Sequence, residues 1–174
     1  MPGRHYLPSL PGRYRSRFRT GSLPGRYRSR FRTESHANEN RYKTFKSLGE
    51  PSTVAGLWHQ IGIVHREAGQ FAQAEDAYRQ GLAIWVQQKL HANEAASLGE
   101  LGNLYGQMGR LEEAVTFLLQ AGEIYAKLQD LNGKGKQHSN LAVTLIGLQR
   151  YDEARPELRR AIECRKPFGH AAEL

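Results

Sequence analysis

Three stretches of this sequence, beginning at residues 57, 97 and 137, share one residue pattern at a spacing of 40 residues. When the three stretches are aligned, each aligned position forms a column. One column has an aliphatic residue in all three stretches, the next column has a small residue, and a later column has alanine in all three. The members of these columns are Ile61, Leu101 and Leu141; Gly62, Gly102 and Ala142; and Ala74, Ala114 and Ala154. A fixed period of about 20–50 residues is typical of repeat proteins, in which each unit buries its apolar face against its neighbours.

The spacing inside each unit predicts a pair of helices. Apolar residues such as Leu98 and Leu101 recur at helical intervals in the first half of the unit. Gly69 and Gly109 stand where a residue with left-handed backbone conformation ends that helix. The third unit has Gln149 at this position, so its turn is expected to be less favourable. Acidic residues that suit the positive end of a helix dipole mark the second helix in two units: Glu112, Glu113, Asp152 and Glu153. The predicted fold class is therefore all-α, an α-solenoid of three stacked helical hairpins.

These columns resemble the pattern of the tetratricopeptide repeat (TPR) family, which has Trp or Leu, then Leu-Gly, then Tyr, Ala and an aromatic residue at fixed offsets. The first unit follows it with Trp58, Ile61, Gly62, His65, Ala74 and Tyr78. The second follows it with Leu98, Leu101, Gly102, Tyr105, Ala114 and Leu118, and the third departs from it at His138, Ala142 and Leu145. The resemblance is to a subtype with a period longer than about 34 residues. It implies TPR units at 55–94, 95–134 and 135–168, and a C-terminal tail at 169–174.

The head of the chain differs from the rest in charge. Residues 1–46 hold twelve Lys and Arg against two acidic residues, whereas the other 128 residues hold 13 basic and 15 acidic side chains. A 13-residue segment occurs there twice, as LPGRYRSRFRTGS and then as LPGRYRSRFRTES. Burying its few larger apolar side chains returns less free energy than fixing its backbone costs, so we predict a disordered basic tail at 1–40.

Three functional interpretations of this tail remain open. It is a passenger left by a recent duplication, a targeting presequence, or an arm that binds nucleic acid. In the last case arginines would meet phosphates while the interleaved aromatic rings stack on bases. The arginines concerned are Arg13, Arg15, Arg17, Arg19, Arg26, Arg28, Arg30 and Arg32.

Residues 41–54 are predicted to be a remnant or capping helix and a linker. Phe45 lies one period before Trp85, and Tyr125 completes this aromatic column, which we interpret as packing. The residues before this segment do not continue the repeat pattern, because Glu34 stands 40 residues before Ala74, where the pattern has alanine. The segment is therefore expected to cover the first hairpin and not to form a fourth one.

The sequence contains no motif typical of catalysis or metal binding. The chain has no HExxH sequence, and its one cysteine, Cys164, excludes a zinc-finger spacing and an intrachain disulfide. The segment NGKGKQ at 132–137 lacks the first glycine of a phosphate loop, because Asp130 stands in its place. We therefore expect no enzyme, no cofactor and no metal, and we expect Cys164 to be a small core residue.

The sequence contains neither a membrane-spanning segment nor a secretory signal. No apolar run approaches the roughly 18 residues that would span a bilayer, and the basic start of the chain lacks the apolar region of a secretory signal. We expect no membrane association and a cytoplasmic protein.

The resemblance implies a protein–protein interaction scaffold whose first helices line a concave groove for a peptide or a partner helix. The candidate groove residues are His59, Gln60, Ile63, Arg66, Glu100, Asn103, Lys136 and Asn140. Chaperone-docking members of the family need a two-carboxylate clamp, and only Lys136 fits its pattern, so binding of chaperone tails is not expected.

Two alternative interpretations concern the whole chain: a nucleic-acid-associated protein that uses its tail, and a fragment of a longer TPR-containing regulatory protein. Two expectations concern the last hairpin. Its second helix is expected to turn Leu158, Ala161 and Ile162 inward, and self-association through this uncapped C-terminal hairpin is a further prediction.

Overall fold

The computed structural model describes the backbone of residues 50–169 and the side chains of residues 50–165. This part of the chain consists of six helices and has no strand: α2 (Pro51–Glu67), α3 (Phe71–Gln87), α4 (His91–Gln107), α5 (Leu111–Lys127), α6 (Leu131–Gly147) and α7 (Tyr151–Gly169). The predictions for the arginine-rich tail, for the covering helix before residue 49 and for the last five residues lie outside the described residues. None of the described helices is both long and apolar enough to cross a membrane.

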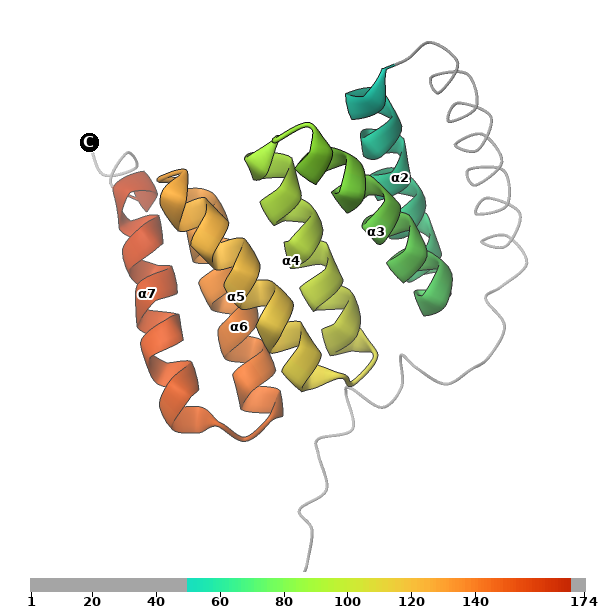
Figure 1. The fold of residues 1–174 in the computed structure, drawn as a ribbon. Coiled ribbons are helices and arrows are strands. Elements are labelled where there is room, and N and C mark those ends of the chain that lie inside the picture. Colours follow the sequence, from blue (N-terminus) through green and yellow to red (C-terminus); the bar gives the residue numbers. More distant parts are fainter. Residues whose placement is uncertain (1–49, 170–174) are drawn as a thin grey trace, which may run out of the picture.

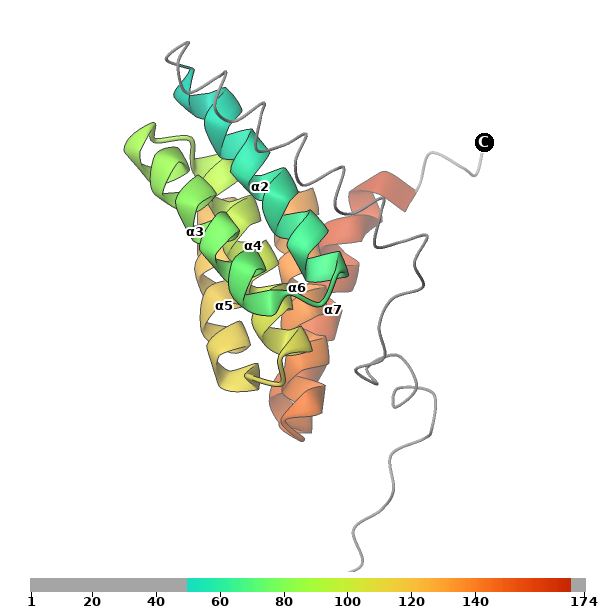
Figure 2. The same ribbon diagram turned by 90° about the vertical axis from the view of Figure 1, so that its right-hand side faces the viewer.

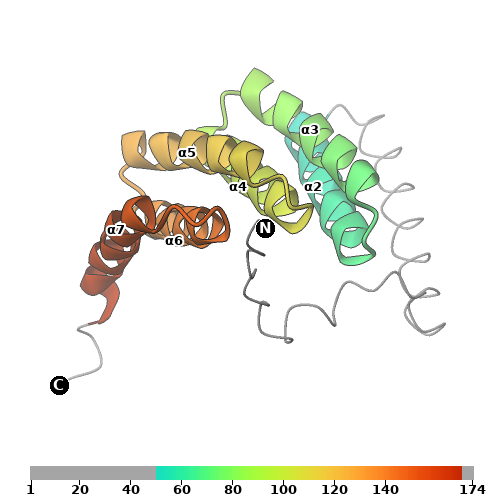
Figure 3. The same ribbon diagram turned by 90° about the horizontal axis from the view of Figure 1, so that it is seen from below.

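The helices form three hairpins that stack in chain order. α2 packs on α3, α4 on α5 and α6 on α7, and successive hairpins meet where α3 packs on α4 and α5 packs on α6 (Figure 1). Seen from the side, the first hairpin stands in front of the other two (Figure 2). Figure 3 shows that α2, α4 and α6 follow the inner side of a curve, with α3, α5 and α7 on its outer side. The predicted all-α solenoid is thus confirmed.

Each pair of helices is joined by a three-residue turn of one design. At the first turn the Gly69 amide donates to the Arg66 carbonyl and the Gln70 amide donates to the His65 carbonyl, which is the Schellman arrangement. The residue at its centre has positive φ in every turn, at Gly69 (73°), Lys89 (53°), Gly109 (78°), Gln129 (55°) and Gln149 (62°). The predicted left-handed glycines are confirmed, and Gln149 adopts the same conformation with a Cβ that disfavours it.

Two apolar clusters join the hairpins. One lies between the first and second hairpins and contains Ala74, Tyr78, Leu101, Leu104, Tyr105 and Ala114. The other lies between the second and third hairpins and contains Val115, Leu118, Leu141, Leu145 and Ala154. The small column exists because large side chains lie directly over it: a Cβ on Gly62 would approach Tyr78 to 2.5 Å. Burial of the Tyr78 ring raises the pKa of its hydroxyl to about 12.

A polar network ties α3 to α4 beside the first cluster. The Tyr105 hydroxyl donates to Glu75 Oε1 at 2.6 Å and accepts from Arg79 Nη2 at 3.1 Å. The hydrogen bond from Tyr105 is the main reason why the pKa of Glu75 lies below its ordinary value. The guanidinium carbon of Arg110 lies over the Tyr105 ring, 4.3 Å from the ring centroid.

The prediction for the last helix was wrong for two of its three residues. Ala161 is buried as expected, but Leu158 and Ile162 are 41% and 59% exposed. Tyr78 and Leu118, which precede Leu158 by two periods and one period, are buried because the next hairpin covers them. No helix in the described part of the chain packs on the equivalent face of α7.

Candidate functional site

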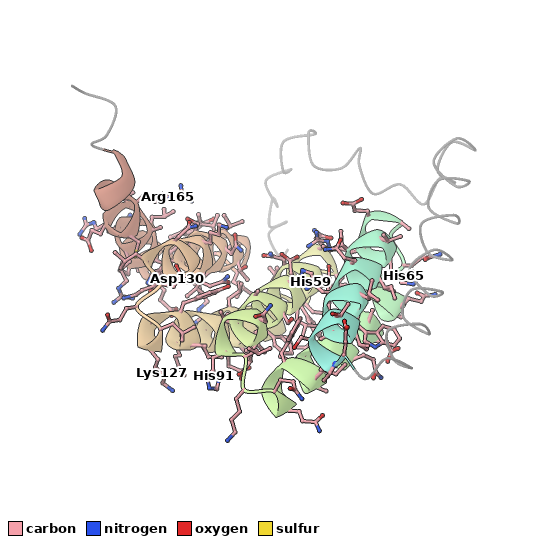
Figure 4. The ribbon with its side chains drawn as sticks, turned by 90° about the horizontal axis from the view of Figure 1, so that it is seen from above. His59, His65, His91, Lys127, Asp130 and Arg165 are labelled. Carbon is pink, nitrogen blue, oxygen red and sulfur yellow. The ribbon has the colours of Figure 1, made fainter. Side chains whose placement is uncertain are left out.

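A cavity of about 320 Å³ lies on the inner side of the curve, and all three hairpins contribute to it. α2 provides His59, α4 provides four residues and α6 provides four more, whereas α5 and α7 each provide one. The remaining lining residues are Ala96, Gly99, Glu100, Asn103, Tyr125, Lys136, Gln137, Ser139, Asn140 and Arg165. In Figure 4, His59 and Arg165 lie on one side of the molecule, and His91 and Lys127 lie on the other.

Five of the eight candidate groove residues meet in this cavity: His59, Glu100, Asn103, Lys136 and Asn140. The other three lie on α2 outside it. Gln60 is exposed, Ile63 packs against the first apolar cluster, and Arg66 pairs with the Glu100 carboxylate. The structure therefore brings the candidates of α4 and α6 together, and their role in binding stays a prediction.

Six lining residues are not among the eight candidates. Ala96, Gly99 and Ser139 lie on the faces that the first helices were expected to turn to the groove, whereas Tyr125, Gln137 and Arg165 were missed. A signal for one of them was present: Arg165 lies one period after Tyr125 and so continues the column of Trp85 and Tyr125. This column had been interpreted as packing. Tyr125 does pack, since a Cβ on Gly133 would lie 2.3 Å from its Cδ1, but its ring also reaches the cavity.

The floor of the cavity is formed where α4 and α6 approach each other. Gly99 permits this approach, because a Cβ on it would lie 2.7 Å from Gln137 Nε2. Gln137 is only 8% exposed, and its Oε1 is buried without a hydrogen-bond partner in the described part of the chain. An unpaired buried acceptor is costly, so this amide is the least satisfied polar group of the cavity.

The charges around the cavity are unequal. The Glu100 carboxylate accepts a hydrogen bond from the Arg66 guanidinium, which neutralises it. Burial lowers the pKa of His59, an effect that Glu100 opposes and Arg66 reinforces, so the imidazole is neutral at pH 7. Lys136 and Arg165 have no carboxylate partner among the described residues, and Arg165 Nη2 reaches Ser139 Oγ at 3.4 Å. The cavity therefore carries an excess of positive charge.

The glycine-rich segment at 132–137 and the cysteine have structural roles. The segment NGKGKQ forms the first turns of α6, where the Gly133 amide donates to Asp130 Oδ1 at 2.9 Å and a Cβ on Gly135 would lie 3.0 Å from Cys164 Cβ. Cys164 is buried, as expected for a core residue. Within residues 50–165, no group of three or more His, Cys, Asp or Glu side chains is placed to hold a metal ion.

A curved stack of helical hairpins, with a cavity shared by the first helices on its inner side, defines the class of α-solenoid repeat proteins. Models of the tetratricopeptide repeat match residues 53–127 and 139–166. The chain belongs to the tetratricopeptide repeat family.

Solved structures share this fold at low sequence identity. BtubC (BKLC) from P. vanneervenii is 19% identical with a TM-score of 0.74, over 82% of this chain and 59% of BtubC. A putative kinesin light chain with nearly identical TPR-like repeats from Podosopora anserina is 19% identical with a TM-score of 0.65, over 83% and 71% of the two chains. MamA is 17% identical with a TM-score of 0.58, over 82% and 86%. A comparison with curated protein sequences found no match.

Proposed function

We propose that this protein is a non-enzymatic interaction scaffold that binds a peptide or a partner helix in its concave groove. One observation carries the proposal: a single cavity on the inner side of the curve is lined by all three hairpins, with glycine at Gly99 and polar side chains at Asn103 and Asn140. Small residues let a ligand backbone approach, and the amides supply donors and acceptors for it. A ligand held there would contact three repeats at once.

A bulky side chain placed in the cavity tests this function. Asn103→Trp puts an indole into the groove, whereas Gln107→Trp puts the same ring on an exposed position of the same helix, outside the cavity lining. Random peptides displayed on phage would be selected against the full chain and then measured against both variants. We expect Asn103→Trp to lose the selected peptides and Gln107→Trp to keep them. Equal binding by the two variants, with matching circular dichroism spectra, would contradict the groove.

The nucleic-acid alternative stays a prediction from the charge of the first 46 residues, which carry ten more basic than acidic side chains. Deleting residues 1–40 separates the two functions. A scaffold keeps its peptide ligands after this deletion, whereas a nucleic-acid binder loses its retention on single-stranded DNA. A cytoplasmic location and self-association through the last hairpin are likewise predictions from the sequence, and sedimentation velocity tests the second.

A further inference from the structure

One face of α7, the last helix of the stack, has no described helix packed on it (Figure 1). The α7 face consists of four residues at spacings of four, three and four, which lie on one side of a helix: Tyr151, Arg155, Leu158 and Ile162. Its three apolar members are between 41% and 59% exposed. The equivalent faces of α3 and α5 pack on α4 and α6, so the α7 face has the form of a surface that receives a helix.

The α7 face resembles the face of α3 that packs on α4. Two periods earlier in the chain, α3 has an aromatic and two further apolar residues at the same spacing, with an acidic residue among them: Phe71, Glu75, Tyr78 and Leu82. All three apolar residues belong to the first apolar cluster or pack against it. The two faces differ in charge, because Arg155 stands where α3 has Glu75.

The residue of the next helix that meets this position is matched to it at both junctions of the stack. At the first junction the Tyr105 hydroxyl donates to Glu75 Oε1 at 2.6 Å and accepts from Arg79 Nη2 at 3.1 Å. A hydroxyl can do both, so it satisfies one acceptor and one donor. At the second junction the equivalent residues are Val115 and Leu145, and both belong to the second apolar cluster.

On α7 both of the equivalent polar positions carry donors. Arg155 stands in the position of Glu75, and Arg159 stands in the position of Arg79. Both arginines are exposed. Arg155 Nη1 lies 3.6 Å from Asp152 Oδ1, but these side chains are 76% and 96% exposed, so the pair contributes little. A group that meets two guanidinium groups must accept from both, and a carboxylate does so with the opposite charge.

We propose that the α7 face binds an amphipathic helix of a partner protein, which has a carboxylate where α4 has Tyr105. Apolar residues of the partner helix cover Leu158 and Ile162, and its carboxylate accepts hydrogen bonds from Arg155 and Arg159. None of these four residues lines the cavity on the inner side of the curve, so the surface is separate from the proposed groove. The first helices of a second copy lack this carboxylate, since they have other residues at the position: His65, Tyr105 and Leu145.

Peptides with the α4 sequence, His91–Gln107, are the probe, because α4 covers the similar face of α3. One peptide has the unchanged sequence, and two others carry Tyr105→Glu and Tyr105→Gln. A lactam bridge on the side away from Leu101 and Tyr105 holds each peptide helical, since isolated helices of this length are marginal in water. Fluorescence anisotropy measures the Kd for the full chain at about 0.15 M salt, where exposed charges more than about 8 Å apart are largely screened.

We expect the Tyr105→Glu peptide to bind about tenfold more tightly than either of the other two. In the protein, Arg155→Glu restores the combination of acceptor and donor found on α3, so this variant should prefer the unchanged peptide instead. Lys127→Glu makes the same change of charge at an exposed position of α5 and should keep the original preference. The N-terminal arginines are present in both variants, so their attraction for an acidic peptide cancels in the comparison.

Two further variants locate the binding surface. Ile162→Ser should weaken the binding of every peptide several-fold, because it removes apolar contact area from an exposed position of the α7 face. Asn103→Trp, which obstructs the inner cavity, should leave the binding unchanged. Loss of binding in Asn103→Trp would place the peptides in the groove and overturn the proposal, without contradicting the proposed function.

Other results would also overturn the proposal. Equal Kd values for the three peptides, or no binding of any of them, would show that the α7 face does not select a carboxylate helix. A preference for the Tyr105→Glu peptide that survives Arg155→Glu would come from the tail. A dimer in sedimentation velocity that Ile162→Ser converts to a monomer would identify a second copy as the occupant. Binding to phosphatidylserine vesicles that Ile162→Ser abolishes would identify a membrane.

Discussion

Substitution of two glycines of α4 tests the close packing between the helices of the second hairpin, because an added Cβ meets neighbouring atoms at one glycine and open space at the other. A Cβ on Gly102 would lie 2.7 Å from Leu118 Cγ and 3.3 Å from the Ala114 carbonyl oxygen. A Cβ on Gly106, one turn further along the same helix, meets no atom within 4 Å. Leu118 is 1% exposed within the second apolar cluster, so it has little room to move away.

The two Gly→Ala variants therefore share one effect and differ in another. Alanine in place of glycine stabilises a helix by about 0.5–1 kcal/mol, and both variants gain this. Only Gly102→Ala must displace Leu118, and overpacking of a core costs about 1–3 kcal/mol. We expect the free energy of unfolding of Gly106→Ala to exceed that of Gly102→Ala by about 1–3 kcal/mol, with Gly106→Ala above wild type.

Urea unfolding followed by circular dichroism measures this difference by linear extrapolation. Tryptophan fluorescence provides an independent probe, since Trp58 and Trp85 both lie in the first hairpin. Coincident transitions by the two probes establish that the three hairpins unfold together, as the comparison requires. Equal free energies for the two variants would refute the reasoning, because Leu118 would then have space that the structure denies it.

Three other predictions concern single side chains. Tyr105→Phe should lower the free energy of unfolding by about 1–3 kcal/mol, because it removes a hydrogen bond to a carboxylate. Tyr78→Phe should be neutral or stabilising, because the Tyr78 hydroxyl is buried without a partner among the described residues. Urea unfolding of both variants measures the difference. Burial lowers the pKa of His59 below 6.5 in the folded protein. As the pH falls, this histidine is therefore protonated in the unfolded chain before it is protonated in the folded one, which lowers the stability. His59→Gln should lose less thermal stability than wild type between about pH 7.5 and pH 5. Gln149→Gly should raise the melting temperature, since φ is 62° there and a left-handed non-glycine residue costs about 1–2 kcal/mol, and Gly109→Gln should lower it.

The sequence predicted the number and type of hairpins but not where each one begins. α2, α4 and α6 start at Pro51, His91 and Leu131, each four residues before the unit boundaries expected at 55, 95 and 135. A period fixes the length of a unit and leaves its phase open, because every 40-residue window repeats equally well. Phase is visible only at the turns, and two turns have Lys89 and Gln129 at the left-handed position, where no glycine marks them.

The candidate site was predicted where it depends on one helix and missed where it depends on two. His59, Glu100 and Asn103 follow from the face that each first helix turns to the inner side. Gln137 reaches the cavity only because Gly99 on the neighbouring helix leaves room for its amide. Arg165 reaches it from the second helix of its hairpin. The first relation is not encoded in the spacing of residues along one segment, and the second was signalled only by the column that Arg165 shares with Tyr125.

The outer face of α7 shows why residue type alone does not determine burial in such a stack. Tyr78, Leu118 and Leu158 occupy one column, yet the first two are at most 1% exposed and Leu158 is 41% exposed. The first two are covered by the hairpin that follows them, and in the described structure no hairpin follows α7. A repeat pattern therefore predicts an inward apolar face only for a unit with a successor, and the exposed fraction of this column reports whether a unit has one.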